Sequence, residues 1–517
     1  MSTRAPLRRR SGRESAPTPV VVIAAVVALV ALIPLGFVVV YTVTLSPGQS
    51  WDLLVRPRMG ELLFNTVRLV VAGCFLSLLL GVGCAWLVER SDLPLRSMWH
   101  LLATAPLAIP AFVNSYGWSS LAPGAEGFGG ALLIVTLSYF PLVYLPVAAS
   151  LRGMDPALDD VAYSQGLSRW EAFTRVTVPQ LMPAMVGGAL LVGLHLLAEF
   201  GALQMLRYPT FTTAIYDQYR SSFNSAGANL IATVLVLCCL GLLLIDLRLR
   251  SNRRFARIGS GVPRDIVAIE LQHWTRPAQV ALTALATLSL GVPLYSLTRW
   301  MIVGSSLSFP FDELASAAGT TIVLGLTAAV AAVLAAAPMA WLVVRYRGRV
   351  STTLERSGYI ANALPGIVVA LALVTVTIRL AQPLYQTVAL LLVAYVILFL
   401  PRALVTVRAA IEQVPPVLED VAHGLGTGAI ETARRVTLPI IAPGVGAGCA
   451  LVFLAVSTEL TATLLLAPIG TTTLATQFWA SSSSLAYAEA APYAVLMVLI
   501  SLPATLLLSR RPTAVVA

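Results

Sequence analysis

Twelve long apolar stretches occupy most of this 517-residue chain and restrict it to one class of fold. Each is long enough to cross about 30 Å of hydrocarbon as a helix. Hydrophobic residues make up 57% of the chain and charged residues 11%, which excludes an ordinary soluble enzyme. The stretches lie at residues 20–44, 63–88, 98–120, 128–151, 181–206, 226–247, 280–304, 318–344, 357–379, 385–411, 441–466 and 488–509. We therefore predict an all-α integral membrane protein with about twelve transmembrane helices.

The distribution of arginine predicts how these helices are oriented. Arginines precede the first stretch and flank alternate loops, whereas the loops at 120–127, 305–317 and 467–487 contain none. Positive charge collects on the cytoplasmic side of membrane proteins, so both termini are expected in the cytoplasm. The first stretch lacks a small-residue cleavage site after a short core, so we interpret it as a retained helix. The net charge of +10 then reflects topology and predicts no nucleic-acid partner.

A repeat divides the chain into two like halves. The segment Asp160-Val-Ala-Tyr-Ser-Gln-Gly166 recurs as Asp420-Val-Ala-His-Gly-Leu-Gly426, and Arg175-Val-Thr-Val-Pro179 recurs as Arg435-Val-Thr-Leu-Pro439. Six spans per half give both halves the same orientation, with a pathway expected between them. The predicted segments are a basic N-terminus (1–19), a first half (20–247) with loop 155–179, a cytoplasmic linker (248–279), a second half (280–509) with loop 415–439, and a tail (510–517).

Local signals predict a helix-turn-helix in each repeated loop. Asp155 and Pro156 are typical of a helix start, and Gly166 permits a sharp turn after a helix that reaches about residue 165. A second helix is expected from 168 to about 176, ending ahead of Pro179. Glu171 and Arg175 are spaced to pair on that helix, as Glu431 and Arg435 are in the second loop. Inert duplicated connectors are the alternative interpretation.

The sequence also excludes several kinds of chemistry. It contains no lysine, which rules out a phosphate-binding P-loop, so any ATP must be bound by another polypeptide. The five cysteines and four histidines show no metal-ligand spacing, and hydrolase nucleophile motifs are absent. We therefore predict no enzymatic activity, no metal site and no cofactor bound by this chain.

Two carboxylates fall inside predicted spans at equivalent positions. Glu199 and Glu459 each lie about 18 residues into the fifth span of their half, roughly 27 Å from its cytoplasmic start. An intramembrane carboxylate indicates a pathway or gate residue, and structural carboxylates bonded to nearby Thr hydroxyls are the alternative. His195 has Ala455 as its counterpart, which favours a local structural histidine. Pro106, Pro110 and Pro365 are expected to kink or break the third spans.

The repeated loops resemble the Glu-Ala-Ala loop of permease subunits of binding-protein-dependent ABC importers. Both copies keep its spacing, with Asp in place of Glu and Val in place of the first Ala. The resemblance implies a bacterial inner-membrane protein in which each loop docks with a separate cytoplasmic ABC ATPase subunit, two in all, which uses the ATP. It also implies an extracytoplasmic substrate-binding protein. The implied coupling residues are Asp160, Ala162, Gly166, Pro179, Asp420, Ala422, Gly426 and Pro439.

The ends of the two halves narrow this resemblance. Residues 458–466 with 471–479, and 199–202 with 211–216, look like those of fused ferric-iron-type permeases. Thiamine and phosphonate permeases are similar, so these and other small solutes are alternative substrates. We expect no direct high-affinity iron coordination, because ferric iron favours hard oxygen ligands and the spans offer few carboxylates. A proton-coupled secondary transporter acting through Glu199 and Glu459 and a non-transporting membrane scaffold or receptor are alternatives of other classes.

Overall fold

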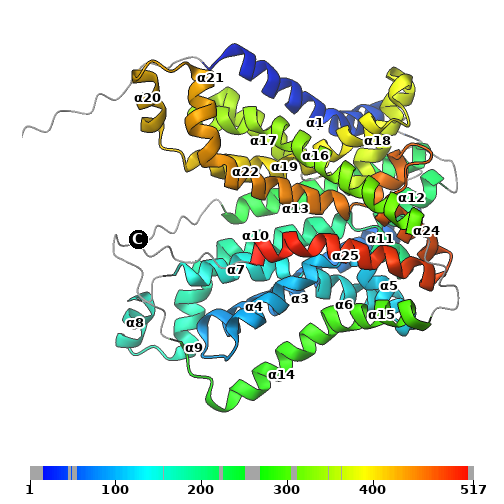
Figure 1. Ribbon diagram of the computed structural model, residues 1–517. Coiled ribbons are helices and arrows are strands. Elements are labelled where there is room, and N and C mark those ends of the chain that lie inside the picture. The colour runs from blue at the N-terminus through cyan, green and yellow to red at the C-terminus, as the bar shows by residue number, and fades with distance from the viewer. Residues whose placement is uncertain are drawn as a thin grey trace, which may run out of the picture. The chain divides into compact units, whose positions relative to one another are not determined.

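The computed structural model describes residues 16–44, 48, 55–154, 157–220, 225–250, 268–303, 311–346, 348–361 and 364–509. These residues form helices and loops, with one isolated bridge between Ser91 and Ile269 (Figure 1). The basic residues before position 16, Asp155 and Pro156, the centre of the linker and the Arg510–Arg511 tail lie outside the described residues. The part of the chain that is described has the predicted all-α class.

The elements follow one another in the same order in both halves. Those of the first half are α1 (Thr18–Thr44), α3 (Pro57–Arg90), α4 (Arg96–Thr104), η1 (Ala105–Ala108), α5 (Ala111–Leu121), α6 (Gly127–Tyr139), α7 (Pro141–Arg152), α8 (Ala157–Ser164), α9 (Arg169–Ala172), η2 (Phe173–Thr177), α10 (Val178–Ala198), α11 (Gly201–Met205), α12 (Phe211–Arg220) and α13 (Ser225–Arg250). Those of the second half are η3 (Gln272–Trp274), α14 (Thr275–Ala286), η4 (Thr287–Gly291), α15 (Val292–Val303), α16 (Phe311–Arg345), α17 (Arg349–Ile360), α18 (Gly366–Leu380), η6 (Gln382–Leu384), α19 (Val388–Glu412), α20 (Pro416–Gly424), α21 (Ala429–Thr432), η7 (Ala433–Thr437), α22 (Leu438–Ser457), α23 (Thr461–Leu466), α24 (Leu474–Ser483) and α25 (Tyr487–Ser509).

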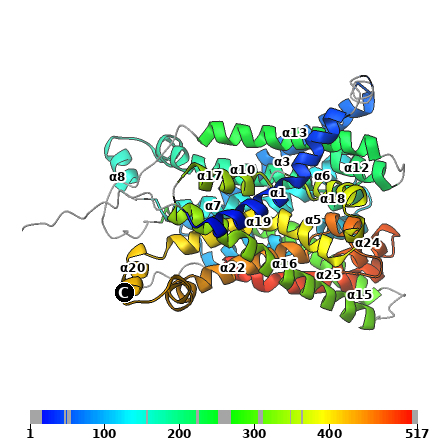
Figure 2. The ribbon, with the colours of Figure 1, turned by 90° about the horizontal axis from the view of Figure 1, so that it is seen from above.

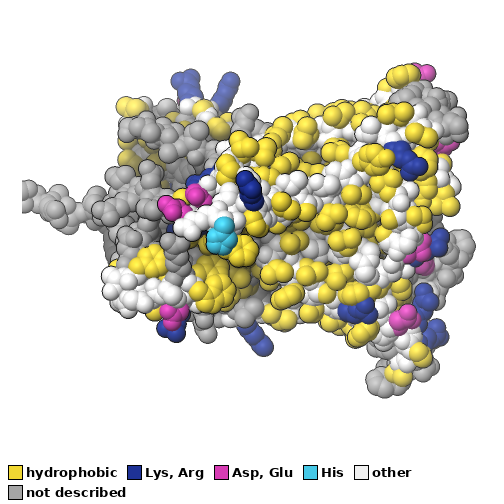
Figure 3. Space-filling model, turned by 90° about the horizontal axis from the view of Figure 1, so that it is seen from below, with side chains coloured by type: hydrophobic (Ala, Val, Ile, Leu, Met, Phe, Trp, Pro, Cys, Tyr) yellow, Lys and Arg dark blue, Asp and Glu magenta, His cyan; other side chains and the backbone are white. Residues whose placement is uncertain are grey.

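Ten described helical segments are long and apolar enough to cross a membrane. The helix α3 shows how such a segment has one face packed inside the protein and another exposed where lipid is expected. Its buried face consists mainly of small or aliphatic residues, including Leu69, Gly73 and Ser77. Its other face exposes large apolar side chains at helical spacing, including Phe75 and Leu79. Hydrophobic side chains are similarly exposed along the long helices in Figure 3, as expected where lipid replaces water as the solvent.

The other two of the twelve predicted spans are interrupted at their prolines, as predicted. The span at 98–120 becomes α4, η1 and α5, with Pro106 inside η1 and Pro110 at the start of α5. The span at 357–379 becomes α17 and α18, with Pro365 at the start of α18. Pro110 and Pro365 have almost the same extended backbone angles, φ −56°, ψ 144° and φ −59°, ψ 146°. Each proline carbonyl accepts the first hydrogen bonds of the following helix, so the break is conserved between the halves.

The prediction for the fifth span of each half is wrong in the C-terminal part of the span. The sequence predicted continuous helices at 181–206 and 441–466, but α10 ends at Ala198 and α22 at Ser457. The short helices α11 and α23 follow after turns that contain Glu199 and Glu459. The apolar pattern continues through these turns, which is why hydropathy alone did not reveal them.

The described residues pack as two compact units. One contains residues 16–33, 327–361 and 396–452, and the other contains residues 34–326, 364–395 and 453–509, with the gaps noted above. Each unit therefore combines segments of both sequence halves. The start of α1 belongs with second-half segments, and α14 and α15 belong with first-half segments.

Close contacts hold α15 against the first half within the larger unit. Ser120 of α5 and Ser296 of α15 share a hydrogen bond of 2.6 Å between their hydroxyls. A Cβ on Gly117 would lie 2.7 Å from Cα of Pro293, so only glycine permits this approach. Small residues work in the same way where α3 and α10 meet α7 at Val143, through Gly81 and Gly188. Next to this core, α10 and α13 run side by side (Figure 2).

Candidate functional site

The turn at Gly166 explains the spacing of the first repeated loop. The helix α8 ends in a pair of hydrogen bonds, from Gly166 N–H to the Tyr163 carbonyl (3.0 Å) and from Leu167 N–H to the Ala162 carbonyl (3.2 Å). This is a Schellman motif, which needs a left-handed residue at the turn, and Gly166 supplies it with φ +81°. Ala162 is buried where α8 packs on α9 and η2. An Ala-x3-Gly pattern therefore encodes a short helix folded back on its successor.

The second loop repeats this geometry. After α20, Gly426 N–H bonds to the His423 carbonyl (3.0 Å) and Thr427 N–H to the Ala422 carbonyl (3.2 Å), with Gly426 at φ +88°. Ala422 is also buried. The two loops therefore share one backbone design, although residues 165 and 425 differ in chemistry.

Both loops expose apolar side chains away from the long helices. Trp170 is 71% exposed in the first loop and Leu425 82% exposed in the second, and both Val161 and Val421 are more than half exposed. Each loop thus presents apolar side chains to solvent. The side chains of Asp159 and Asp160 lie outside the described residues, so Asp160 is placed only by its backbone in α8.

The helix after each turn does not stop at the proline, which corrects the sequence-based boundary at 176. In the first loop the chain continues through the π-helical turn η2 into α10, with Pro179 near the start of α10. Val178 N–H bonds to the carbonyl of Phe173, five residues earlier. The wider turn accommodates the proline ring, which would clash in a regular helix, and Leu438 makes the same bond to Ala433 ahead of Pro439. One continuous helix, Trp170–Ala198, thus runs from the loop to the Glu199 turn.

The start of this helix is stabilised differently in the two copies. In the first, Ser168 N–H and hydroxyl donate to the Glu171 carboxylate (3.0 and 2.9 Å), and Glu171 N–H donates to the Ser168 hydroxyl (3.3 Å), a capping box. The second copy has Gly428 at the equivalent of Ser168. The predicted ion pairs are confirmed, with Arg175–Glu171 at 3.7 Å and Arg435–Glu431 at 2.9 Å.

A buried ion pair, which we call the loop clamp, ties the second loop to the end of α16. Arg345 Nη2 lies 2.8 Å from Glu419 Oε1, and both side chains are mostly buried. The same guanidinium donates to the Val414 carbonyl, and Thr437 donates to Glu419 (3.1 Å). The sequence reasoning missed this clamp, because its partners are 74 residues apart.

The loop clamp has counterparts in the first half. The repeat matches Arg345 with Arg90, Glu419 with Asp159 and Thr437 with Thr177. Arg90 reaches Met154, the counterpart of Val414, with 3.7 Å between Nη2 and Sδ. The acid at the Glu419 position is thus kept in the first half as Asp159.

Glu459 caps the short helix α23. Its two carboxylate oxygens accept N–H groups from Ala462 (3.0 and 3.1 Å) and Thr463 (3.1 Å), and the Thr463 hydroxyl adds a bond of 3.0 Å. The Thr463 hydroxyl also contacts the Tyr395 hydroxyl (2.7 Å). A carboxylate at a helix start satisfies N–H groups that have no partner within the helix. This arrangement matches the structural alternative given for Glu459.

Glu199 is held differently, although its position is equivalent. Its Oε1 accepts the Ala202 N–H at 3.0 Å, and its Oε2 accepts a short hydrogen bond from the Tyr139 hydroxyl. The Thr212 hydroxyl bonds to the Glu199 backbone carbonyl at 2.6 Å. His195 stands against the Tyr139 ring, with 5.4 Å between ring centroids. Tyr139 lies 60 residues from Glu199, so no local sequence signal pointed to it.

The turns after α10 and α22 meet where the two halves adjoin. A Cβ on Gly201 would lie 2.9 Å from Phe112 Cβ and 3.0 Å from Leu460 Cδ2. Phe200 and Leu460, the residues after the two glutamates, are both buried in one apolar cluster with Phe112. The turns that follow α10 and α22 are thus in contact with each other through apolar side chains.

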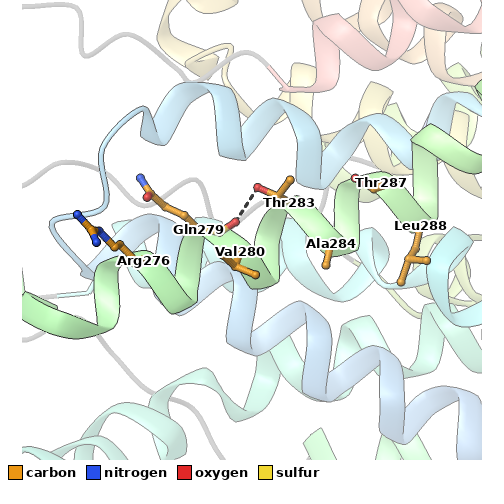
Figure 4. A pocket seen from close by; sticks show the side chains of 7 residues that line it. All are labelled: Arg276, Gln279, Val280, Thr283, Ala284, Thr287 and Leu288. Carbon is orange, nitrogen blue, oxygen red and sulfur yellow. Dashed lines mark hydrogen bonds between the residues drawn. The ribbon is translucent and has the colours of Figure 1, made fainter.

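Two cavities lie along the described helices. The first, about 640 Å³, is lined only by residues of α14 and η4, such as Gln279 and Thr283 (Figure 4). It is the open face of one helix, and we assign it no function. The second, about 780 Å³, lies between the end of α3, the first loop and the start of α14, and Trp86, Trp170 and Trp274 contribute to its walls.

Among the described residues, no group of three or more His, Cys, Asp and Glu side chains is arranged to hold a metal ion. Glu199 nevertheless has the phenol of Tyr139 as its neighbour.

Comparison with known proteins assigns the chain to a family. A family model described as the inner membrane component of binding-protein-dependent transport systems matches residues 77–257 and 322–510, once in each half. The Fe(3+)-transport system permease protein FbpB 2 of Haemophilus influenzae is 39% identical over 91% of this chain and 93% of its own length. The sulfate permease protein CysT of Escherichia coli is 27% identical over 45% of this chain and 90% of its own. The molybdate/tungstate permease protein WtpB of Thermococcus kodakarensis is 25% identical over 42% and 90%.

The last two relatives correspond to about half of this chain, whereas the first extends across both halves. The repeat, the helical membrane fold and the paired family matches agree. This chain belongs to the inner-membrane components of binding-protein-dependent transport systems, the permease subunits of ABC importers.

Proposed function

We propose that this chain forms the membrane pathway of an ATP-driven importer of ferric iron. The observation that carries the substrate is the similarity to a ferric-transport permease over 91% of this chain, including both halves. The sulfate and molybdate relatives are less similar and align with under half of it. The Glu199 carboxylate at the first chain break also suits a cation better than an oxyanion.

The two repeated loops are proposed as docking points for two cytoplasmic ATPase subunits. Their compact helices α8 and α20 expose apolar side chains that a groove on a partner would cover. Ala162, Gly166, Ala422 and Gly426 fix the backbone of these helices, and Asp160 and Asp420 lie on them. Pro179 and Pro439 mark the π-helical turns where each loop joins its long helix.

A rigid helix would transmit loop movement to the pathway. Trp170–Ala198 contains 29 residues, or about 44 Å at 1.5 Å per residue. Its far end carries Glu199, Phe200 and Gly201, which pack near Leu460 of the other half. ATP-driven movement of the loop would therefore displace the apolar contact at Phe200 and Leu460 and open the pathway there. Substrate would be delivered by an extracytoplasmic binding protein.

The test is uptake of radiolabelled ferric iron by cells that lack this gene and receive the intact chain with its ATPase and binding protein. Restored uptake that disappears with a hydrolysis-deficient ATPase is the expected result. Uptake that persists without the ATPase would instead support a proton-coupled transporter. No restoration, with the chain shown to be in the membrane, would reject ferric iron and bring sulfate, molybdate, thiamine and phosphonate forward as substrates.

A further inference from the structure

Three side chains with the chemistry that binds ferric iron lie together in the first half. They are Tyr139 at the end of α6, His195 in the last turn of α10, and Glu199 directly after α10. The Tyr139 hydroxyl donates to Glu199 Oε2, and the His195 and Tyr139 rings lie 5.4 Å apart. All three are only partly buried. Phenolate and carboxylate are hard oxygen ligands, and imidazole also suits iron.

The contacts of His195 set its tautomer. Its Nδ1 lies 2.8 Å from the Leu191 carbonyl, which can only accept a hydrogen bond. Nδ1 therefore carries a proton, and in the neutral ring Nε2 carries the lone pair. A backbone carbonyl that holds one ring N–H while the other nitrogen faces a metal is a common arrangement in metal sites.

Glu199 and Glu459 differ in how their oxygens are used. In Glu459 both oxygens accept N–H groups of α23, so its carboxylate is committed to capping. In Glu199 one oxygen caps α11 through Ala202, and the other accepts the Tyr139 hydroxyl. Exchange of the phenolic proton for a metal ion would therefore leave the cap intact.

The cluster occurs in one half only. The repeat places Phe399 at the position of Tyr139 and Ala455 at that of His195. Positions 399 and 455 carry no phenol or imidazole, and the nearby phenol of the second half, Tyr395, contacts the Thr463 hydroxyl. Helix packing at these two positions therefore does not itself require a phenol or an imidazole.

The cluster also lies at the expected pathway. Gly201, two residues after Glu199, approaches Leu460 of the second half. The boundary between parallel repeats is where substrate sites form in membrane transporters. Ionisable groups in and next to membrane-spanning segments indicate function.

We propose that Tyr139, His195 and Glu199 form a transient coordination site for ferric iron on its way through the permease, an inference that rests on the proposed substrate. Binding converts the Tyr139 phenol to a phenolate bound to Fe(III), and the proton passes to water. Glu199 Oε2 loses its hydrogen bond and becomes a second oxygen ligand, and His195 Nε2 becomes a nitrogen ligand. The oxidation state of iron does not change, and water fills the other positions. Because the protein supplies only three ligands, on one side of the ion, the ion is bound loosely enough to be released.

A second group of the same residue types provides a matched control. Tyr144, His100 and Glu89 also lie together, with the Tyr144 hydroxyl 2.7 Å from His100 Nδ1. Here Arg152 lies 3.2 Å from Glu89 and neutralises the carboxylate, and all three side chains are buried. This group is not a cation site, so Tyr144→Phe tests for the loss of a tyrosine hydroxyl alone.

The experiment uses the full importer, with its ATPase and binding protein, in cells and in lipid nanodiscs. Tyr139→Phe and His195→Ala install the residues that the second half already has, and Glu199→Gln keeps an oxygen for the Ala202 N–H. We expect each to lower ferric uptake about 10- to 100-fold, with ATP hydrolysis in response to loaded binding protein retained, and Tyr144→Phe to match the wild type. Purified importer given ferric citrate should show a visible phenolate-to-iron charge-transfer band that Tyr139→Phe abolishes and Tyr144→Phe keeps.

The outcomes separate this inference from the proposed function. If the wild-type importer takes up no iron, the proposed substrate is wrong. If it takes up iron and Tyr139→Phe and His195→Ala transport as well as the wild type without loss of the band, the site is refuted. If Tyr139→Phe fails to reach the membrane, His195→Ala, which removes no hydroxyl from the glutamate, decides the question.

Discussion

The backbone at Gly166 and Gly426 has φ angles of +81° and +88°, and nothing lies within 4 Å of where a Cβ would be. A substitution there meets no steric neighbour, so its effect comes from backbone conformation alone. Left-handed backbone costs ordinary residues about 1–2 kcal/mol, whereas asparagine tolerates it better. The turn of each loop can therefore be perturbed without disturbing its packing.

We predict that Gly166→Val combined with Gly426→Val weakens the coupling of ATP hydrolysis to transport, because both turns lose their preferred conformation. Gly166→Asn combined with Gly426→Asn should stay close to the wild type. The measurement is the ratio of solute transported to ATP hydrolysed in reconstituted vesicles. Equal ratios for the two double variants would show that the turn conformation is irrelevant to coupling.

A second residue-scale prediction concerns the cap at Glu459. Glu459→Ala removes every acceptor for the Ala462 and Thr463 N–H groups and should destabilise the protein by about 0.5–2 kcal/mol. Glu459→Gln keeps one oxygen and should lie between Ala and the wild type in thermal stability, with near-normal transport. A large transport defect in a stable Glu459→Gln protein would restore a pathway role for this residue.

Sequence reasoning at this scale succeeded where the signal is local. Gly166, Gly426 and the Glu171–Arg175 pair depend on neighbours within five residues, and the structure places them as predicted. Tyr139 escaped prediction because its contact with Glu199 depends on how α6 and α10 pack, which hydropathy does not encode.

At the scale of helices, proline gave opposite outcomes. Pro110 and Pro365 break their spans, and the backbone at both is extended, with ψ 144° and 146°. Pro179 and Pro439 do not, because a π-helical turn absorbs the ring and lets the helix continue. The sequence shows where a regular helix is disturbed, but the surrounding packing decides whether it stops.

The loop clamp between Arg345 and Glu419 should stabilise the second loop. Arg345→Glu or Glu419→Arg should each destabilise the second loop by about 1.5–3 kcal/mol, since a hydrogen-bonded charge loses its partner. The double variant, Arg345→Glu with Glu419→Arg, should recover part of the loss in a double-mutant cycle of thermal stability and coupled transport. Strictly additive effects would show that the two side chains do not interact.

For the whole molecule, the repeat predicted two halves but not how they pack. Residues 16–33 belong to a unit with second-half helices, and α14 and α15 pack with the first half. A uniformly apolar helix does not specify which helix it packs against. The sequence therefore did not reveal that the first span of each half packs with helices of the other half. Close contacts such as Gly117 with Pro293 carry that information, and they are visible only in three dimensions.

We predict that the chain can be cut between residues 250 and 268 and still assemble. The two fragments should copurify from membranes and restore uptake when coexpressed, because α15 holds onto α5 through Ser120 and Ser296. A second fragment that begins at residue 311, without α14 and α15, should be recovered far less well with the first. Equal recovery of both versions would mean that the exchanged helices contribute little to assembly.

The joining of two like halves in one chain has an evolutionary consequence. In a transporter built from two copies of one polypeptide, every substitution next to the axis appears twice, and an adaptation that helps on one side can harm on the other. Here position 139 is Tyr while 399 is Phe, and 195 is His while 455 is Ala. Because the halves are fused, each transporter contains one copy of each half. Selection can therefore give the two sides of one transport pathway different functions.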